Sequence, residues 1–415
     1  MEEKKNSSCN EDIDVVIEAG KILMESGAEI YRIEETMKHM ACALKMEHFS
    51  AYVVNRGIIA SCTNSLGDNK ARVAAVSETA IHLGKIEKVN SLSREIEKND
   101  ISAEDIAKRL EDIDKMNESD LGAVLIAYLI GAGCFSYAIG SSVVDSFSSA
   151  IIGLILGLFL WWAGRYIKTT VLLTILGSMV VTALANVLCA IGIGQHRGLI
   201  ILGSLMLMVP GAVFTNSVRE FSQNNHATGL TLLMSALLTC LAISCGVAFM
   251  TGILPFAEQM TSVFSNEVDS VWEVLARTVM AGIGTVAFSY LFHAPKKYYL
   301  DLGGLGATSW MLYLLLNMYF HLENYTILAP AIFAALASRF LSVRRKCPIT
   351  IFLSTSIFPL IPGLSFYRAV YFAMTGSAEL AMTYMRSCFV SAFAIALSII
   401  IIQEIRVRPI YKTVK

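Results

Sequence analysis

The chain has 415 residues, of which 16% are charged and 55% are apolar, with a formal net charge of −1 and a mean hydropathy of +0.57. Because soluble domains carry about 25% charged residues, this composition excludes an ordinary soluble enzyme, a disordered chain and a nucleic-acid binder. Residues 1–120 contain 16 Lys/Arg and 24 Asp/Glu, a net of −8, whereas the other 295 residues contain 17 and 10, a net of +7. The sequence therefore predicts a small acidic domain followed by a large membrane domain.

The first 120 residues carry the patterns of a small α/β domain. Their opening stretch is polar, so we expect no cleaved secretory leader. Apolar residues at three- and four-residue spacing predict amphipathic helices, and short β-branched and aromatic runs predict a sheet. Ser102, with acidic residues two and three positions later, is typical of a helix N-cap. The expected helices cover 13–27, 30–44, 86–96 and 102–115, and the expected strands cover 49–55, 57–64 and 71–76.

No group of residues has the spacing of a metal, cofactor or catalytic site. The nine cysteines are scattered without a CxxC pair or a Cys/His cluster, and no GxxxxGK[ST] phosphate loop is present. The Glu34-Glu35 pair has no nucleophile partner in the sequence and is better explained as a solvated helix face. We therefore expect reduced thiols, no metal, no cofactor and no enzyme activity, and a regulatory or gating role for residues 1–120.

Beyond residue 120, ten apolar stretches are long enough to cross a hydrocarbon core of about 30 Å, which takes about 20 helical residues. They lie near 121–140, 143–163, 169–191, 198–215, 228–251, 271–292, 302–320, 325–342, 348–366 and 380–403. Lys and Arg favour the cytoplasmic side of a membrane. Thirteen of them, including Arg219, fall in the tail and the connections on one side, against Arg197 and Arg368 on the other. We expect both termini in the cytoplasm.

The two halves of the membrane domain repeat each other. A Pro-Gly pair at Pro210 recurs at Pro362, 152 residues later, and an FSY motif at Phe135 recurs at Phe288, 153 residues later. Five spans per half is an odd number, so two halves of like fold enter the bilayer from opposite sides, as in many secondary transporters. Chance similarity of short apolar motifs is the alternative. The expected repeats cover 121–265 and 266–415, the second with a cytosolic tail.

Polar residues and helix breaks within the spans are the candidates for a substrate or ion path, because a charge at bilayer depth costs about 2.5–3.5 kcal/mol. They are Asp145, Asn186, Pro210, Gly211, Asn216, Arg277, Asp301, Pro362, Gly363, Arg368 and Arg386. Pro-Gly bends or unwinds a helix where protein or water supplies partners. Asp145 and Asp301 could serve as helix caps, or they could take part in gating and proton coupling. Arg277 and Arg386 fit either a substrate carboxylate or a structural ion pair with Glu273 or Asp145. Asn186 and Asn216 could bind a hydroxyl or ammonium group, although hydrogen bonds between helices are the better explanation.

Longer motifs carry a resemblance to a known family. SGAEIYRIEETMKHMACALKM from Ser26 and RKCPITIFLSTSIFPLIPG from Arg345, which continues to Arg368, resemble segments of the bacterial threonine/serine exporter (ThrE-type) family. FSYAIGSSVVDSF is similar to that family's glycine-glycine-aspartate turn, with Gly140 and Asp145 in place but serine for the second glycine. The resemblance covers nearly the whole chain, and the segment from Arg345 is its most specific part.

The resemblance implies a polytopic α-helical protein of the bacterial cytoplasmic membrane, with ten transmembrane helices and a cytosolic N-terminal domain. Such a protein exports threonine, serine or similar small metabolites at the expense of the proton gradient, and from the two five-helix repeats we expect alternating access. Relatives that occur as two polypeptides are associated with dicarboxylate export, so a succinate-like substrate is an alternative. A passive channel or homo-oligomeric pore is another. A third is a membrane enzyme, but an intramembrane aspartyl protease needs two aspartates side by side at depth, whereas we expect Asp145 and Asp301 at opposite faces of the membrane. The expected partners are the small-molecule substrate, protons and lipid, without nucleic acid.

Overall fold

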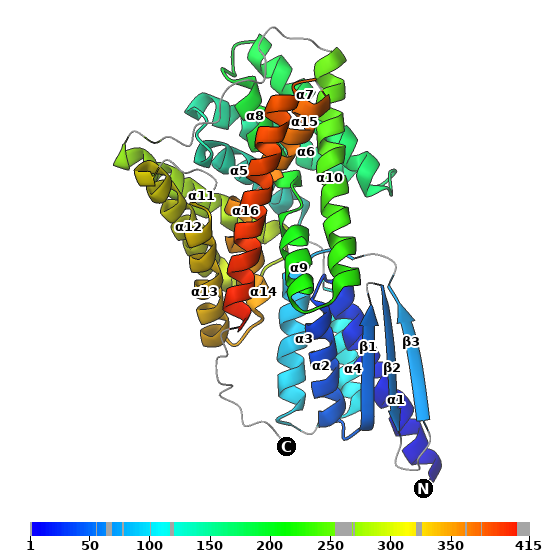
Figure 1. The fold of residues 1–415 in the computed structure, drawn as a ribbon. Helices are drawn as coiled ribbons and strands as arrows, with labels where there is room; N and C mark the ends of the chain where they lie inside the picture. The colour runs from blue at the N-terminus through cyan, green and yellow to red at the C-terminus, as the bar shows by residue number, and fades with distance from the viewer. Residues whose placement is uncertain are drawn as a thin grey trace.

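The protein has two parts, which Figure 1 shows end to end. Among the residues that the structure describes, the N-terminal part, within 2–116, contains three strands and four helices, and the helical part, within 120–404, contains helices alone. The computed structural model describes residues 2–54, 56–63, 69–76, 79–99, 101–116, 120–253, 268, 270–320, 326–361, 363–374 and 376–404.

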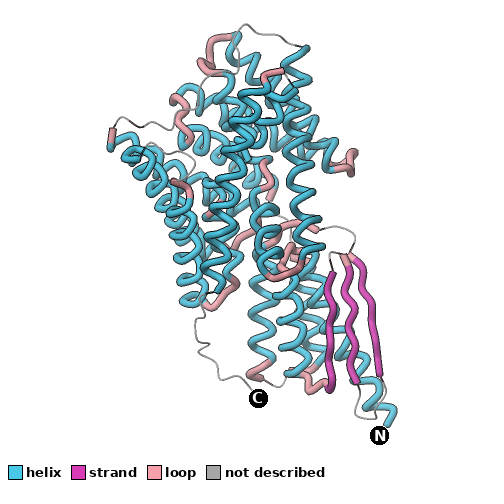
Figure 2. Tube along the Cα trace, in the orientation of Figure 1, coloured by secondary structure: helices cyan, strands magenta, loops and turns pink. Residues whose placement is uncertain are grey.

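The N-terminal part is built in three layers. Its elements are α1 (Glu2–Glu25), α2 (Ile30–Ala43), β1 (Glu47–Val54), β2 (Gly57–Thr63), β3 (Asn69–Ala75), α3 (Leu83–Ile96) and α4 (Ala103–Asp114). The strands form an antiparallel sheet in the order β1-β2-β3. Helices α1 and α2 pack on one face of this sheet, and α3 and α4 pack behind them (Figure 2). All the expected helices and strands of this part are present, although α1 begins earlier than expected.

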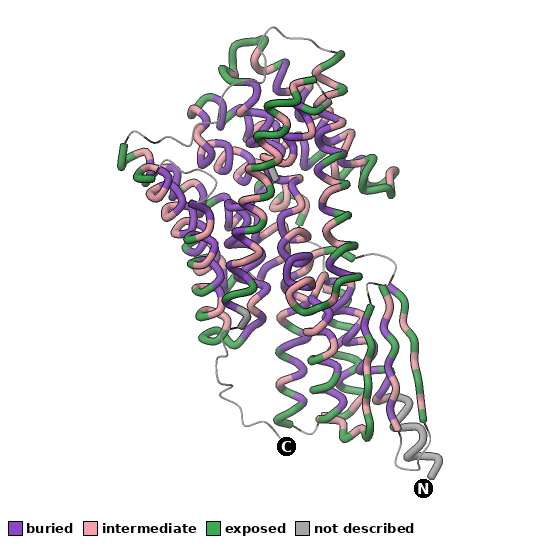
Figure 3. Tube along the Cα trace, in the orientation of Figure 1, coloured by how far each residue is buried: buried purple, intermediate pink, exposed green. Residues whose placement is uncertain are grey.

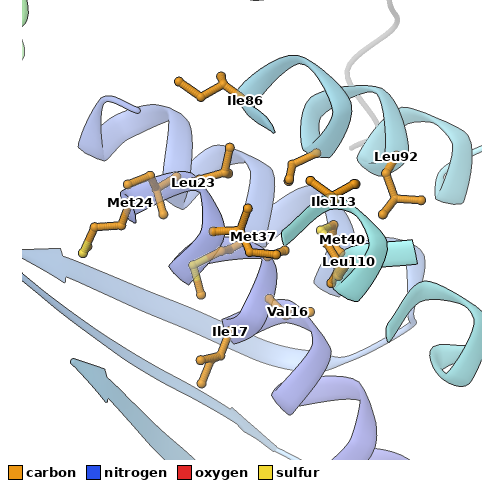
Figure 4. Close-up of a cluster of buried hydrophobic side chains, with 14 of the residues drawn as sticks. Val16, Ile17, Leu23, Met24, Met37, Met40, Ile86, Leu92, Leu110 and Ile113 are labelled. Atoms are coloured by element: carbon orange, nitrogen blue, oxygen red, sulfur yellow. The ribbon is translucent and has the colours of Figure 1, made fainter. Parts of the chain in front are cut away.

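Local sequence explains these elements. The Ser102 hydroxyl accepts a hydrogen bond from the backbone N–H of Asp105 at 3.2 Å, so α4 begins at the expected N-cap. Apolar side chains spaced at three and four residues place one stripe of each helix toward the others, and Figure 4 shows these stripes meeting in one core. The same core continues into the helical part through Tyr298, Leu302 and Phe352. The two parts therefore share buried apolar surface.

The helical part follows the expected order of spans. Its helices are α5 (Leu121–Ala138), α6 (Val143–Ala163), α7 (Thr170–Ala190), α8 (Arg197–Leu205), α9 (Gly211–Ser222), α10 (His226–Ile253), α11 (Val271–Leu291), α12 (Tyr299–Phe320), α13 (Leu328–Arg345), α14 (Ile349–Ser356), α15 (Gly363–Met374) and α16 (Ala378–Glu404). Short 3-10 turns, η1 (Met206–Met208), η2 (Lys296–Tyr298) and η3 (Phe358–Leu360), join or precede some of them.

The helical part has the composition of a polytopic membrane protein. Within the described ranges, α5, α6, α7, α10, α11 and α16 are each long and apolar enough to cross a membrane. The count becomes eight if α8 with α9 and α14 with α15 are each one bent span. Helices α12 and α13 cover two further expected spans but are less apolar than these helices. Glycines and polar residues lower the hydropathy of α12, and three arginines lie in α13. Ten spans therefore stay a prediction.

The exposure of apolar side chains also indicates a membrane protein. Large apolar side chains such as Phe147, Leu158, Phe389 and Phe393 are exposed on the helical part. Figure 3 shows exposed residues along the outer sides of these helices and buried residues between them. A soluble monomer rarely exposes so much contiguous apolar surface, whereas lipid tails would cover it.

The centre of the helical part is formed by elements from both halves of the sequence. Helix α5 packs against α6 and against α11, and α11 packs against α12. Helix α10 packs against α7 and α9 but also against α15, while α16 packs against α13, α15 and α9. Each broken helix pair therefore contacts the long helix that ends the other half.

Candidate functional site

Two broken helices lie in the middle of the helical part. Helices α8 and α9 meet at an angle of 55°, and the α14 and α15 segments meet at 48°. At the first break, Pro210 has no N–H with which to continue the helix, and α9 starts again at Gly211. At the second, Ile361 is extended with φ −69° and ψ 131°, and α15 starts again at Gly363; Pro362 lies outside the described residues. The chain bends at both places where the sequence predicts it.

The two breaks touch each other at Gly211. A Cβ atom at this position would lie 2.7 Å from Ile361 Cδ1 and 2.8 Å from Phe358 Cδ2. Such distances are shorter than ordinary van der Waals contacts, so a side chain at this position would force Ile361 and Phe358 to shift. Gly211 of the first break and Ile361 of the second, 150 residues apart in sequence, are thus brought together in space.

Three phenylalanines surround this crossing, and we call them the aromatic centre: Phe135, Phe288 and Phe358. The rings of Phe288 and Phe358 stack with centroids 3.7 Å apart, and Phe135 lies 5.4 Å from Phe358 and 6.0 Å from Phe288. Phe135 and Phe288 are the first residues of the two FSY motifs. The two FSY motifs are therefore in contact beside the crossing.

A buried charged cluster lies between the crossing and the N-terminal part. The Arg219 guanidinium on α9 donates a hydrogen bond to the carboxylate of Glu29, which immediately precedes α2. The hydroxyl of Thr350 on α14 donates to the same carboxylate at 2.8 Å, and Tyr31 Oη lies 3.3 Å from Arg219 Nη2. The side chain of Glu29 is 0% exposed and that of Arg219 is 1% exposed. We call Glu29, Tyr31, Arg219 and Thr350 the junction cluster.

Further polar contacts surround the junction cluster. The backbone N–H of Ile30 donates to Glu220 Oε1 at 2.8 Å, and Asn216 Nδ2 lies 3.4 Å from the carbonyl oxygen of Gly27. Arg32 Nε pairs with Glu29 at 3.3 Å. The start of α2 is therefore held against α9 and α14 by groups from all three helices.

A second contact between the two parts involves histidine. The rings of His82 and His293 stack at 4.4 Å, and His82 Nδ1 accepts a hydrogen bond from the Lys85 backbone N–H at 3.0 Å. Burial, followed by the positive charges that His293 and Lys85 can carry, lowers the pKa of His82 to about 4. Close by, Lys297 pairs with Glu87 at 2.8 Å. His82 is therefore neutral at pH 7.

On the other side of the aromatic centre, away from the N-terminal part in Figure 1, α8 and α15 line a small cavity. Its lining residues are Gly198, Leu202, Tyr367, Arg368, Tyr371 and Phe372, and it has room for about one water molecule. Arg368 is buried, its Nη1 lies 3.4 Å from Tyr384 Oη, and its guanidinium lies over the Tyr384 ring. Beside the cavity, Arg197 Nη1 donates to Asn186 Oδ1 at 3.3 Å.

Asp145 organises the turn that precedes α8. Its buried carboxylate accepts hydrogen bonds from the backbone N–H groups of Gln195 and His196 at 2.7 and 3.1 Å. It also accepts from Ser142 Oγ at 2.9 Å and lies 2.9 Å from Nδ1 of the His196 ring. Ser142 is the N-cap of α6. The aspartate therefore joins the start of α6 to the chain entering the first broken helix.

The remaining sequence candidates lie elsewhere. Arg277 is buried and pairs with Glu273 one turn earlier on α11, which is one of the structural ion pairs considered from the sequence. Asp301 pairs with Arg345 at 2.9 Å, and Arg386 is exposed on α16. Because Asp145 and Asp301 have separate sets of partners, the structure does not form them into an aspartyl dyad.

The sequence did not single out the junction cluster. Arg219, expected in a connection on the cytoplasmic side, is instead a buried residue of α9, because that helix continues to Ser222. Arg197 and Arg368, expected in outer connections, lie buried in α8 and α15. Glu29 and Thr350 both fall inside the family-like motifs from Ser26 and Arg345, which is the one signal that could have indicated them.

Comparison with known proteins agrees with these motifs. The threonine/serine exporter family model ThrE matches residues 14–254, and a second model, described as Threonine/Serine exporter, ThrE, matches residues 277–405. Neither the curated proteins nor the solved structures contain a match to the chain. Because the first model alone covers more than half of the sequence, the chain belongs to the ThrE family of threonine/serine exporters, with both family regions fused in one polypeptide.

Proposed function

We propose that this ThrE-family transporter exports threonine, serine or a similar small metabolite by alternating access, driven by the proton gradient. The substrate path runs between the broken helices α8–α9 and α14–α15, past the aromatic centre. One observation carries the proposal: Gly211 of one break contacts Ile361 and Phe358 of the other. Polar groups lie on either side of this contact, the junction cluster toward the N-terminal part and the Arg368 cavity away from it.

The order of elements supports an inverted repeat of residues 121–265 and 266–415. Three helices, one broken helix and one long helix occur in this order in 121–253 and again in 271–404. With α12 and α13 as the seventh and eighth spans, each half crosses the bilayer five times and the halves have opposite orientations. The contact of Phe135 with Phe288 is the contact expected near a pseudo-two-fold axis.

The orientation follows from charge. Lys296, Lys297, Arg344 and Arg345 lie at the end of the helical part that contacts the N-terminal part. Since cytoplasmic segments are rich in Lys and Arg, we place this end, the N-terminal part and both termini in the cytoplasm of a bacterial cell. The N-terminal part then lies at the entrance of an export path, where it can regulate access.

We assign substrate contact to Asn186, Asn216 and Arg368, and proton transfer to Asp145 with His196. The side chains of Asn186 and Asn216 each have one buried polar atom without a hydrogen-bond partner within the described part of the chain. The Asp145–His196 pair is a buried carboxylate beside an imidazole that is about half exposed, so the pair connects the buried carboxylate with water.

Reconstitution tests the proposal. Proteoliposomes containing the full chain should move labelled threonine or serine when a pH gradient is imposed, and a protonophore should abolish the movement. Flux that does not depend on the pH gradient would favour a passive pore. No gradient-dependent flux of any amino acid or dicarboxylate would contradict the proposal.

A dicarboxylate is the second candidate substrate, and one observation favours it. The buried Arg368 lines the cavity between α8 and α15, and the buried Arg197 immediately precedes its lining residue Gly198; guanidinium groups bind carboxylates in a bidentate manner. Unlabelled succinate should then compete with labelled threonine. If succinate moves and threonine does not, the dicarboxylate is the substrate.

A further inference from the structure

The Glu29 side chain occupies an unusual position. It precedes α2 at the N-cap position, yet it makes no capping hydrogen bond to that helix. Its carboxylate instead enters the helical part, where Arg219 and Thr350 donate to one oxygen and Arg32 and Thr350 approach the other. Arg219 and Thr350 are 190 and 321 residues away in the sequence. A carboxylate from the N-terminal part is thus held by the two broken helices.

The surroundings of this carboxylate have unused hydrogen-bonding capacity. Across the described residues of this region, Arg219 Nε, Asn216 Oδ1, Ser354 Oγ and Ser26 Oγ are buried and have no hydrogen-bond partner. Asn216 is three residues before Arg219 on α9, and Ser354 is four residues after Thr350 on α14, so each pair shares a helix face. Buried polar groups normally find partners. Several such atoms beside one held carboxylate indicate a site that can bind more than Glu29.

A purely structural role accounts less well for this arrangement. Moving two charges out of water costs free energy, and an apolar pair of similar size often stabilises a fold as well or better. A purely structural ion pair also has no need for unpartnered donors and acceptors around it. A site for a zwitterion needs them, because it must hold a carboxylate, an ammonium group and, for threonine or serine, a hydroxyl.

We propose that Arg219 and Thr350 bind the carboxylate of the transported amino acid at the cytoplasmic end of the path, and that Glu29 occupies this site as an internal competitor. The inference rests on the proposed export function and deepens it. Asn216 Oδ1 and the carboxylate of Glu220 are the acceptors available to the substrate's ammonium group, and Ser354 Oγ is available to its hydroxyl. Substrate binding displaces Glu29, and the start of α2 leaves α9 and α14.

Kinetics of the full chain in proteoliposomes test this competition. An internal group that fills the site in about nine of ten molecules weakens apparent affinity about tenfold, so Glu29→Gln should lower the threonine KM on the N-terminal face about tenfold. The matched control is Glu87→Gln, which breaks another ion pair between the parts, with Lys297, and does not touch Arg219. Its KM should stay within about twofold of wild type. Equal KM values for the two variants would overturn the inference.

Hydrogen exchange on the unmodified protein removes any dependence on how the variants fold. Ile30 donates its N–H to Glu220 in the closed arrangement, so saturating L-threonine should accelerate amide exchange over residues 29–33. L-Threoninamide, which lacks the carboxylate, should not. If exchange over these residues is the same with both compounds, Arg219 does not bind the ligand carboxylate. The exchange measurement does not depend on transport. If wild-type protein shows this exchange response but no transport, the proposed export function is contradicted and the proposed carboxylate site is not.

Discussion

Replacing Gly211 with alanine tests whether the two broken helices must touch. The added Cβ would lie 2.7 Å from Ile361 Cδ1 and 2.8 Å from Phe358 Cδ2, so both side chains must move. Overpacking of this kind costs about 1–3 kcal/mol. Because the contact lies on the proposed path, Gly211→Ala should also reduce the turnover of threonine in proteoliposomes by about tenfold or more, a cost in activation free energy of about 1.4 kcal/mol or more.

Two further variants make this prediction specific. Gly304→Ala on α12 is the matched control, because a Cβ there has nothing within 4 Å and alanine favours a helix interior by up to about 1 kcal/mol. Ile361→Val removes the Cδ1 atom that Gly211→Ala would strike and by itself costs about 0.5–1.5 kcal/mol. The double variant Gly211→Ala/Ile361→Val should therefore lose less stability than the sum of the single variants.

The assay is thermal unfolding in detergent, followed by circular dichroism, together with initial flux rates. We expect Gly211→Ala to lower the Tm, Gly304→Ala to preserve or raise it, and the double variant to recover part of the loss. Additive effects of Gly211→Ala and Ile361→Val, or a Gly211→Ala protein as stable and active as wild type, would refute the close contact between the breaks.

Three other predictions concern packing, pH and the turn before α8. Gly246→Ala should destabilise the protein by about 3 kcal/mol or more, because its Cβ would lie 2.0 Å from Ser178 Oγ and 2.4 Å from the Ile175 carbonyl oxygen. Gly252→Ala, on the same helix, should be neutral because a Cβ there has nothing within 4 Å. Equal Tm values for the two variants would argue against this packing. The pKa of His82 is about 4 in the folded protein, below its unfolded value of about 6.5, so the stability that neutral His82 contributes is complete above pH 6.5 and is lost as the pH falls toward 4. His82→Asn, which keeps an N-cap acceptor for α3, should therefore show a smaller drop in Tm between pH 7 and pH 5 than wild type, and an unchanged drop would exclude His82 as its source. Asp145→Asn should lower the stability of the protein by about 1–3 kcal/mol, because four donors converge on this carboxylate. His196→Asn removes one of these donors and should cost less. A Tm for His196→Asn as low as that for Asp145→Asn would contradict this prediction.

Local patterns in the sequence predicted much of the fold. In the N-terminal part, the spacing of apolar residues indicated the helices and the β-branched and aromatic runs indicated the strands, and Ser102 marked the start of α4 because capping is a local interaction. The breaks at Pro210 and Pro362 followed from the missing N–H of proline, and the structure bends at both places. The repeat itself stays a prediction, although the two residues that its offset pairs, Phe135 and Phe288, lie in contact.

The chemistry of the site depended on contacts that no local pattern contains. Arg219 was counted as a loop charge because its helix could not be extended past the apolar stretch, yet the fold buries it against Glu29. Asp145 could be a cap or a functional group from its sequence position, and its partners Gln195 and His196 are about fifty residues away. Both Arg277 and Arg386 are charged residues within predicted spans, so the sequence could not show that Arg277 has a partner one turn away whereas Arg386 is exposed.

Counterflow of labelled threonine tests the central claim most directly. Proteoliposomes loaded with unlabelled threonine and diluted into a trace of labelled threonine should accumulate the label transiently above its external concentration, because a carrier that exposes its site alternately exchanges one molecule for another. Gly304→Ala should preserve this overshoot and Gly211→Ala should suppress it. A label that only equilibrates across the membrane, or a wild-type overshoot that Gly211→Ala leaves intact, would contradict a path of alternating access between the two broken helices.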